Sequence, residues 1–587
     1  MNSEKYTLSS EEIDSMGDLT KENLIGFPSS DKPWLKYYSE DALNAAPPRF
    51  TMYRYIWENN KDYLSDIAFR YFGTTVTYGE FFGNVKQTVK AMVAMGISSG
   101  DMVTIMSMHT PETIYCIYAL NYIGAVANLI YMTLSEKEIL DAIESTNSKL
   151  LFALDPAVDR ISNIIKRIDI PVVLLSVADS MPFTMAILYR IKNSVSVKGA
   201  MSYREFLKQG EGRELPAEST DHKSTAVIVY TSGSTGTPKG VMLSNDAINI
   251  LAFQDMNGIL PFERELTILF ILPTFLGFGI SNIHIILCAG FEVSLQLQLN
   301  PEIVAKALYK RVPNVFLTGP AFIDAIVAPQ YENEDLSSLK VFIGGGGELP
   351  KEKEVEFNKY LYRHNSSAKY LCGYGMTETA SALTTNCNEV NKFGSVGIPF
   401  FMVNVKVIDT NTGEELEYDN EGELHFSTPN MMIGYFKNEK ATEEVLYKDS
   451  MGNTWIRSGD LGYVDRDGFV YVTGRIKRIC FTRAKDGFSY KLFPQRIEEI
   501  LQAESDIEKC GVITKEDEQR INVAVAFVTL KDKEMPQEIR ETIRMRLFDV
   551  AARELPEHEQ PADIIIIDTI PVTPSGKMDY QALKDKI

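Results

Sequence analysis

This 587-residue sequence gives little support for a disulfide framework, a metal cluster or a basic stripe on the protein surface. It has only six cysteines, scattered and without any C-x-x-C pair, which argues against a disulfide framework or a zinc site and is typical of reduced thiols in the cytoplasm. Acidic residues (79) outnumber basic ones (59), so the formal net charge is −20. A surface that coats nucleic acid needs basic stripes, and we therefore expect no nucleic-acid partner.

A signal peptide and a membrane span are also missing. The first residues are polar and acidic, without the basic and then apolar layout of a signal peptide. One stretch, Leu266–Phe291, has no charged side chain and is long enough to span a bilayer, but Pro273, Gly277 and Gly279 interrupt it. This pattern predicts a buried strand at Thr267–Leu272, then a loop, a buried helix and a strand. We expect a cytoplasmic protein with no transmembrane span.

Strand and helix patterns alternate along most of the chain from Thr51, which predicts a mostly parallel α/β sheet. Short strands take over at Asn404, and a small α+β portion follows Arg475. The chain is also too long for one ordinary core. The predicted fold class is therefore α/β, with a large N-terminal domain (residues 1–476) and a small α+β C-terminal domain (residues 477–587). The large domain would hold mostly parallel sheets flanked by helices, plus a β-rich subdomain.

The segment Met181–Lys192 is apolar on nearly every side, so that no clean amphipathic stripe can be drawn. We favour a buried helix, or one that covers a crevice. The alternative is a lip that receives an apolar substrate or makes peripheral contact with a membrane.

The most informative stretch is Val227–Asn245, in which a short buried-strand pattern ends in small hydroxylated residues and glycine. Backbone N–H groups, hydroxyls and an ammonium group can bind one polyanion there, and the glycines let the backbone approach it. The usual nucleotide P-loop spacing fails, because Pro238 precedes the lysine and Gly240 follows it. The plain alternative is a Ser/Gly-rich surface loop. The candidate phosphate-binding residues are Thr231, Ser232, Gly233, Ser234, Thr235, Gly236, Thr237 and Lys239.

This stretch closely resembles the phosphate-binding signature of the acyl-adenylate-forming superfamily, which contains the acyl-CoA synthetases, the adenylation domains of peptide synthetases and firefly luciferase. Four further motifs follow in the family's usual order, so the resemblance covers about residues 50–587 and is greatest to the AMP-forming acyl-CoA synthetases. It implies ATP, Mg²⁺ and CoA as cofactors. It also implies that the small C-terminal domain is mobile and rotates about a hinge between two half-reactions.

Two glycine-bearing loops resemble the family's adenine site. In the first, Gly344–Pro350, four glycines at the end of a strand permit a close approach of backbone to ligand. In the second, Gly373–Thr379, Thr377 would contact the α-phosphate and Glu378 would hold Mg²⁺, since a hard divalent cation takes a carboxylate and phosphate oxygens. Tyr374 would stack on the adenine. The nucleotide-binding residues implied in these loops are Gly346, Gly347, Glu348, Tyr374 and Gly375.

Four charged residues later in the chain also match the family's motifs. Asp460, in WIRSGDLG, would accept hydrogen bonds from the ribose hydroxyls. Arg475 would contact the nucleotide and Lys477 would be the hinge, with a solvated basic patch as the alternative for Lys477. Lys577, in PSGK, resembles the catalytic lysine that stabilises charge on the α-phosphate and the acyl carboxylate. The implied catalytic set is Lys577, Glu378, Thr377 and Lys239.

The chain departs from the family's pattern at two places. Many fatty-acyl and aryl members have a histidine after P-x-F, near the acyl carboxylate, whereas LPTFLGFG places Leu276 there. The aspartate with which amino-acid-activating domains hold the α-amine is absent as well. A pocket predicted from Phe275, Leu276 and Gly373 fits an apolar acid and disfavours an α-amino acid. The segment 480–493, which normally lines the thiol half-reaction, is longer than usual.

We therefore predict an AMP-forming carboxylic acid–thiol ligase. A carboxylate, most simply of a fatty or related acid, would attack the α-phosphorus of ATP to give acyl-AMP and pyrophosphate, and the acyl group would then pass to CoA. Two alternatives stay open. One is an acyl-AMP ligase that loads the phosphopantetheine of an acyl carrier protein, and the other is a non-catalytic scaffold that binds nucleotide without releasing pyrophosphate.

Overall fold

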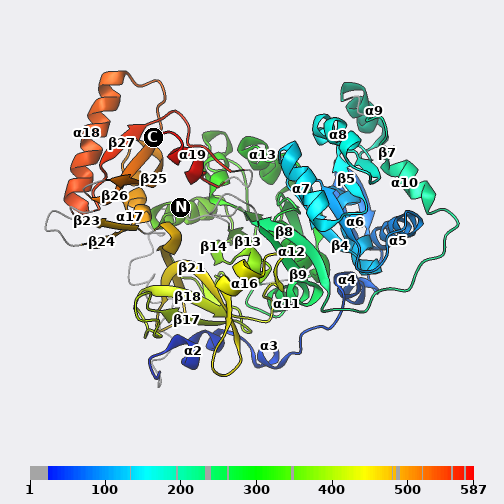
Figure 1. Ribbon diagram of the computed structural model, residues 1–587, viewed down its shortest axis with the longest axis horizontal. Helices are drawn as coiled ribbons and strands as arrows, with labels where there is room; N and C mark the ends of the chain where they lie inside the picture. Colours follow the sequence, from blue (N-terminus) through cyan, green and yellow to red (C-terminus); the bar gives the residue numbers. More distant parts are fainter. Residues whose placement is uncertain are drawn as a thin grey trace.

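The computed structural model describes residues 24–587 with short gaps. The gaps are residues 133, 194–195, 232–238, 261–262, 346–348, 479, 484–488, 518–519, 557–558 and 574–576, and only the backbone is described for residues 477, 481, 483 and 489–491. The described residues form two large sheets, a β-rich sheet and a separate C-terminal part (Figure 1). The strands of the two large sheets interleave along the chain: β1 (Ile67–Tyr71) and β2 (Thr74–Thr77) of one sheet precede β3 (Met102–Met106) of the other, which later receives β19 (Gly434–Tyr435).

The first large sheet has eight strands, parallel from β8 to β7. Its strands in spatial order are β19 (Gly434–Tyr435), β9 (Lys239–Ser244), β8 (Thr225–Thr231), β4 (Val126–Leu129), β3 (Met102–Met106), β5 (Leu151–Leu154), β6 (Val172–Leu175) and β7 (Met201–Ser202). The central strands are rich in Val, Ile and Leu because both faces are covered, as is usual for parallel sheets.

The second large sheet has nine strands and is parallel from β14 to β1. Its strands in order are β16 (Ile398–Pro399), β15 (Thr384–Thr385), β14 (Tyr370–Tyr374), β13 (Val341–Gly344), β12 (Val315–Thr318), β10 (Thr267–Phe270), β11 (Glu292–Leu295), β1 (Ile67–Tyr71) and β2 (Thr74–Thr77). Residues of both sheets belong to one continuous hydrophobic core.

Helices that are buried on nearly every side contribute to this core. All residues of α6 (Pro111–Ile123) and almost all of α12 (Gly277–Ala289) are buried, which is why neither sequence shows an amphipathic stripe. Helix α12 lies between β10 and β11, so the long uncharged stretch is a strand, a buried helix and a strand, as predicted. No helix in the described part of the chain is long and apolar enough to cross a bilayer.

Helix α9 (Phe183–Lys192) corrects one of our expectations. The favoured interpretation, a buried or crevice-covering helix, is wrong, because Ala186 is its only buried residue. The apolar composition on which that interpretation rested does not reveal which side of a helix meets the protein.

The β-rich subdomain is one antiparallel sheet. Its strands are β17 (Asn404–Ile408), β18 (Gly422–Ser427), β21 (Thr454–Val464), β20 (Leu446–Lys448) and β22 (Val470–Arg475). The turn between β21 and β22 carries Gly468 at φ +94°, where an added Cβ would meet the buried Trp34 of the N-terminal segment. This turn and Trp34 together fix the N-terminal segment against the subdomain.

The C-terminal part has its own hydrophobic clusters and occupies one end of the molecule in Figure 1. Its elements are β23 (Cys480–Arg483), β24 (Ser489–Leu492), α17 (Pro494–Gln502), β25 (Ile507–Asp517), β26 (Ile521–Leu530), α18 (Gln537–Glu554), β27 (Asp563–Ile566) and α19 (Tyr580–Lys584). The predicted fold class is therefore confirmed, while the domain boundary at residues 476/477 stays a prediction.

Candidate active site

The phosphate-loop candidate is the connection of a β-hairpin. Strands β8 and β9 pair antiparallel, and their last pair joins Thr231 to Lys239. Residues 232–238 between them lie outside the described part of the chain. The hairpin therefore fixes Lys239 at the carboxyl edge of the parallel strands, where α/β sheets bind ligands.

Lys239 and Glu378 both contact Tyr435, Lys239 at its ring and Glu378 at its hydroxyl. The Lys239 Nζ lies 4.9 Å from the centre of the Tyr435 ring, and the Tyr435 hydroxyl donates a hydrogen bond of 2.6 Å to the Glu378 Oε1. Burial, the charge of Glu378 and this hydrogen bond raise the pKa of Tyr435 well above its usual value, so the hydroxyl keeps its proton. Tyr435 thereby holds the carboxylate in place beside a cation.

Three elements position this group. Glu378 is buried in a short 3₁₀ turn, η7 (Thr377–Thr379), that follows β14, and its carbonyl accepts from the backbone N–H of Met432. Tyr435 belongs to β19, which pairs with β9 through Val241. The sequence separates these residues by more than fifty positions, and the sheet order brings them together.

Asp460 lies at the centre of a second polar group. The Tyr374 hydroxyl donates to its Oδ2 at 2.6 Å, and the Arg475 Nε lies 3.0 Å from its Oδ1. The β21–β22 register places Asp460 directly opposite Arg475. Burial raises the pKa of Asp460, and Arg475, Tyr374 and Lys577 oppose this effect.

Lys577 reaches the same region from the C-terminal part. Its neighbour Met578 forms an antiparallel bridge with Val572. The pKa of Lys577 is lowered, first by desolvation and then by the positive charge of Arg475, while the charges of Asp460 and Glu378 act to raise it. The side chain is nevertheless accessible to water.

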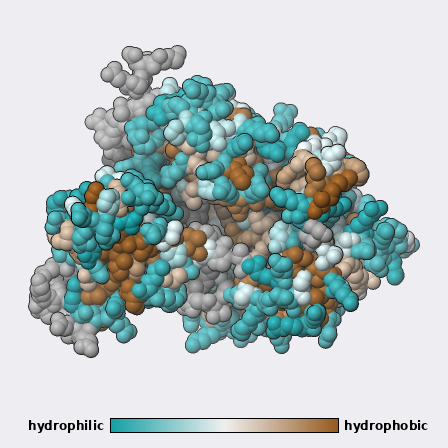
Figure 2. Space-filling model, turned by 90° about the horizontal axis from the view of Figure 1, so that it is seen from above, coloured by the Kyte–Doolittle hydropathy of each residue, from teal (hydrophilic) through white to brown (hydrophobic). Residues whose placement is uncertain are grey.

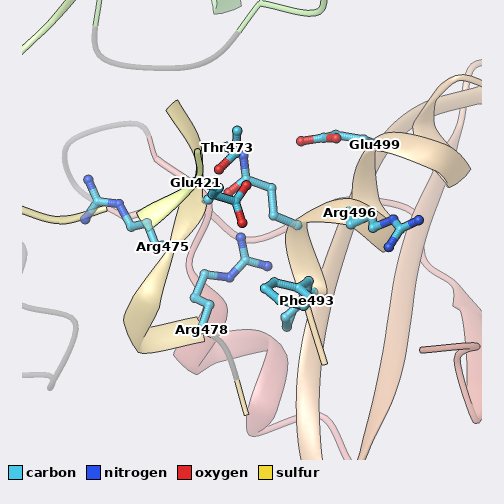
Figure 3. A pocket seen from close by; sticks show the side chains of 10 residues that line it. Glu421, Thr473, Arg475, Arg478, Phe493, Arg496 and Glu499 are labelled. Atoms are coloured by element: carbon cyan, nitrogen blue, oxygen red, sulfur yellow. The ribbon is translucent and has the colours of Figure 1, made fainter. Parts of the chain in front are cut away.

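A hollow of about 370 Å³ lies behind this site, between β22 and α17. Figure 3 shows that Arg478 and Phe493 face each other across it, whereas the guanidinium of Arg475 points away. Arg478 is held by Glu498 at 2.7 Å and by Tyr580 at 3.0 Å, all within the C-terminal part. The hollow is a seam between β22 and the C-terminal part, and Arg475, which pairs with Asp460, is one of its lining residues.

The candidate acyl pocket adjoins the α-phosphate residue. At Gly277, which follows Leu276, an added Cβ would lie 2.9 Å from the Thr377 Cγ2. Phe275 is buried against Tyr131, with ring centres 4.9 Å apart, and Leu276 is half-buried. The segment before α12 therefore packs directly on the motif that contains Thr377 and Glu378.

Glycine is required in the adenine-loop candidate for a steric reason. A Cβ at Gly375 would lie 1.6 Å from the Ser381 carbonyl oxygen, and one at Gly373 would lie 3.1 Å from the Thr384 carbonyl oxygen. Both residues stand at the carboxyl end of β14, where the chain folds back on itself.

Comparison with known proteins gives this geometry a family. The sequence model described as the AMP-binding enzyme matches residues 56–436, and that of the AMP-binding enzyme C-terminal domain matches residues 496–577. The chain belongs to the AMP-binding enzymes. The members named below are adenylate-forming enzymes, and this chain is an enzyme of the AMP-forming acid–thiol ligase type.

Curated relatives of this AMP-binding enzyme cover nearly its whole length. A long-chain-fatty-acid–CoA ligase of Bacillus subtilis (strain 168) is 27% identical over 521 residues, which are 86% of this chain and 90% of the relative. The 4-coumarate–CoA ligase 4 of Arabidopsis thaliana is 25% identical over 535 residues, 88% of this chain and 87% of the relative. Luciferin 4-monooxygenase of Photinus pyralis is 26% identical over 525 residues, 87% and 88% of the two chains.

Solved structures share the fold of this AMP-binding enzyme. ATP-bound MatB from Rhodopseudomonas palustris superposes with a TM-score of 0.76 at 22% identity, covering 91% of this chain and 98% of that one. The o-succinylbenzoate CoA synthetase of Bacillus subtilis, in complex with its acyl-adenylate, gives 0.73 at 24% identity, with coverage of 90% and 98%.

The structure of this AMP-binding enzyme does not describe several of the predicted nucleotide-binding residues. They are Ser232, Gly233, Ser234, Thr235, Gly236, Thr237, Gly346, Gly347 and Glu348, together with the side chain of Lys477. The structure brings Lys239 to Glu378 through Tyr435, and Tyr374 and Arg475 to Asp460. Phe275 packs on Tyr131, and Leu276 precedes Gly277, which lies against Thr377. Sequence reasoning missed Tyr435, because only the pairing of β19 with β9 reveals its place beside Glu378.

Proposed function

We propose that this AMP-binding enzyme activates an apolar carboxylic acid with Mg-ATP to give acyl-AMP and pyrophosphate, and then transfers the acyl group to CoA. The observation that carries the proposal is a pair of buried carboxylates, each held beside a cation: Glu378 by the Tyr435 hydroxyl under Lys239, and Asp460 by the Tyr374 hydroxyl and Arg475. The charges of Arg475, Asp460 and Glu378 also act on the pKa of Lys577 in the C-terminal part. An arrangement that gathers these charges from both parts of the chain supports nucleotide chemistry at their meeting point.

The chain's own residues would position the reactants and balance their charge. The substrate carboxylate is the nucleophile, so the protein needs no nucleophile of its own. Lys239 and Lys577 would stabilise negative charge on the phosphates as the carboxylate oxygen bonds to the α-phosphorus and pyrophosphate leaves. Asp460, held by Tyr374 and Arg475, would accept hydrogen bonds from the ribose.

The residues around Glu378 fit a magnesium ion. Its carboxylate is buried, oriented by Tyr435 and made of the hard oxygen donors that Mg²⁺ prefers. Within the described residues no three His, Cys, Asp or Glu side chains converge, so Glu378 and the phosphate oxygens of ATP would hold the ion together. When bound, Mg²⁺ would neutralise phosphate charge.

An apolar acid fits the acyl side best. Leu276 stands where a histidine would serve a polar contact, and Phe275 packs on Tyr131 beside it. No ionised group in this segment could hold an α-amine. The relatives are named for fatty and for coumaric acids, and we take a fatty acid as the simpler match to an apolar lining without an ionised group.

CoA is the proposed thiol, and a carrier protein is the second candidate. The segment 480–493 is a two-stranded hairpin, β23–β24, and not a compact loop. Because this segment normally lines the thiol half-reaction, an added hairpin is the feature that favours a larger acceptor.

Pyrophosphate release across a panel of straight-chain, branched and aromatic acids, each with and without CoA, tests the proposal. We expect sustained turnover with an apolar acid only when CoA is present. Release that stops after about one turnover with or without CoA would favour a carrier protein. If no acid causes pyrophosphate release although the protein binds nucleotide, the result would contradict catalysis and favour the scaffold hypothesis.

A further inference from the structure

Helix α9 presents its apolar side to solvent. Phe183, Leu188 and Ile191 are 80%, 67% and 74% exposed. The protein side of the helix consists of small or hydrogen-bonded residues: Ala186 is buried, and the Tyr189 hydroxyl donates to the Asp155 Oδ1 at 3.1 Å. The helix is thus anchored by one side and leaves its larger apolar side chains uncovered.

The exposed residues form one stripe. With 3.6 residues per turn, Phe183, Ile187, Ile191 and Leu188 fall within an arc of about 140° around the helix. Arg190 and Lys192 lie at the two borders of this arc. A stripe of large apolar side chains bordered by basic ones is the pattern of a helix that lies in a membrane interface.

The segment that contains α9 is basic, whereas the whole chain is acidic, although Arg190 is paired with Asp179 at 3.1 Å. From Ser180 to Arg204 the sequence has no Asp or Glu, while it contains Arg190, Lys192, Lys198 and Arg204. The net charge of the chain is −20. An anionic lipid surface would attract this segment and repel most of the remaining surface, which gives the molecule a defined orientation.

The chain leaves the sheet for α9 at the same edge as the phosphate-loop candidate. Strand β6 ends at Leu175 before α9, and β8 ends at Thr231 before the phosphate loop. Strands β8, β4, β3, β5 and β6 are all parallel, so both carboxyl ends lie at one edge of the sheet. Figure 1 shows α9 at the periphery, far from the C-terminal part, and Figure 2 shows an apolar patch on that side of the molecule.

We propose that α9 docks this enzyme on the surface of an anionic lipid membrane, with Phe183, Ile187, Leu188 and Ile191 inserted between headgroups and Lys192 and Lys198 facing lipid phosphates. Charge complementarity selects a membrane over a second copy of the chain, whose surface is apolar at this helix but also basic. An apolar acid partitions into membranes, so docking there would place the enzyme beside its proposed substrate.

Vesicle co-sedimentation of the full chain tests this inference, because it measures binding and does not depend on catalysis. We expect binding to phosphatidylcholine vesicles that contain 30% phosphatidylglycerol, with little binding to pure phosphatidylcholine. The triple variant Phe183→Ser/Leu188→Ser/Ile191→Ser should bind at least tenfold more weakly. Lys192→Gln/Lys198→Gln should lose about fivefold for each removed charge, and 0.5 M salt should weaken wild-type binding in the same direction.

Met451→Ser is the matched control. Met451 is 81% exposed in the turn between β20 and β21, so its removal changes exposed apolar surface without touching α9. It should bind anionic vesicles like the wild type. Failure of the wild type to bind either vesicle, or equal binding by the triple variant, would overturn the inference. A wild-type dimer in solution that the triple variant converts to monomer would also overturn it, since α9 would then be a self-association surface.

Discussion

At the residue scale, Tyr435 is the contact that connects the cation and the carboxylate of the candidate site. Its hydroxyl donates to Glu378 and its ring lies under Lys239. A hydrogen bond to an ionised carboxylate contributes more than one between neutral groups, about 1.5–3 kcal/mol. Glu378 would therefore lose much of its orientation without the hydroxyl.

Tyr435→Phe should reduce the rate of acyl-AMP formation about tenfold, because it removes the hydroxyl and keeps the ring. It should also raise the Mg²⁺ concentration needed for half-maximal rate. Acid-dependent ATP–pyrophosphate exchange over a Mg²⁺ series measures both effects. Tyr447→Phe is the control: Tyr447 bonds His425 at 2.7 Å in the β-rich subdomain, and its loss should leave both quantities unchanged. Equal behaviour of the two variants would contradict a positioning role.

Glu112 is a buried carboxyl that sits outside the proposed chemistry. It lies in the first turn of α6, accepts a hydrogen bond from the Ser180 hydroxyl, and has an Oε2 with no partner among the described residues. Burial raises its pKa from 4.5 to about 7, with Ser180 opposing the shift. The folded state therefore binds this proton more tightly than the unfolded chain does.

The contribution of the bound Glu112 proton to the free energy of unfolding should be fully present below about pH 4.5, and it should be lost as the pH rises through about 7. Glu112→Gln, which cannot ionise, should thus raise the free energy of unfolding at pH 8 by up to about 3 kcal/mol, with little change at pH 4.5. Chemical denaturation at the two pH values measures the difference. A variant that is destabilised equally at both would show that the carboxyl serves only as a hydrogen-bond acceptor.

At the element scale, sequence patterns predicted most of the structure that surrounds the site. The strand before the phosphate loop and the buried strand and helix within Leu266–Phe291 follow from runs of apolar residues and turn residues. Local sequence patterns predict an element when neighbouring residues show both its hydrophobic period and the residues that begin and end it.

Features that depend on distant contacts could not be predicted in this way. The exposed side of α9 follows from which neighbours it has, and the hairpin in 480–493 follows from pairing between β23 and β24. The hydrogen bonds from Tyr435 to Glu378 and from Tyr374 to Asp460 join residues far apart in the chain. Motif resemblance identified Glu378 and Asp460, but not the side chains that hold them.

The start of α12 offers a test of how tightly the acyl segment and the phosphate motif are packed. An alanine Cβ at Gly277 would lie 2.9 Å from the Thr377 Cγ2 and 3.3 Å from its Cα, so Gly277→Ala must displace Thr377. We expect acyl-AMP formation to slow at least tenfold while the far-ultraviolet circular dichroism stays the same.

Gly83→Ala is the matched control for this change. Gly83 lies within α5 (Tyr78–Ala94), and no heavy atom lies within 4 Å of its added Cβ. It should keep full activity and gain about 0.5–1 kcal/mol in stability, because alanine favours a helix over glycine. Loss of activity in the control, or none in Gly277→Ala, would contradict the packing argument.

At the scale of the whole molecule, we propose that the two parts of the chain complete one site. The large part would supply Lys239, Glu378, Asp460 and Arg475, and the C-terminal part would supply Lys577, whose pKa responds to the charges of Arg475, Asp460 and Glu378. If the predicted boundary at residues 476/477 holds, rotation about residue 477 would withdraw Lys577 and expose the acyl-AMP to a thiol.

The most direct test of this account compares the two half-reactions in Lys577→Ala. Acid-dependent ATP–pyrophosphate exchange should fall at least a hundredfold, because the variant lacks the cation that stabilises charge in the adenylation step. Thioester formation from supplied acyl-AMP and CoA should stay within about threefold of the wild type, since that step follows withdrawal of the lysine. Lys584→Ala, an exposed lysine in α19, is the control and should leave both rates unchanged. Equal loss of both half-reactions in Lys577→Ala, or unchanged exchange, would contradict the proposed role of the lysine.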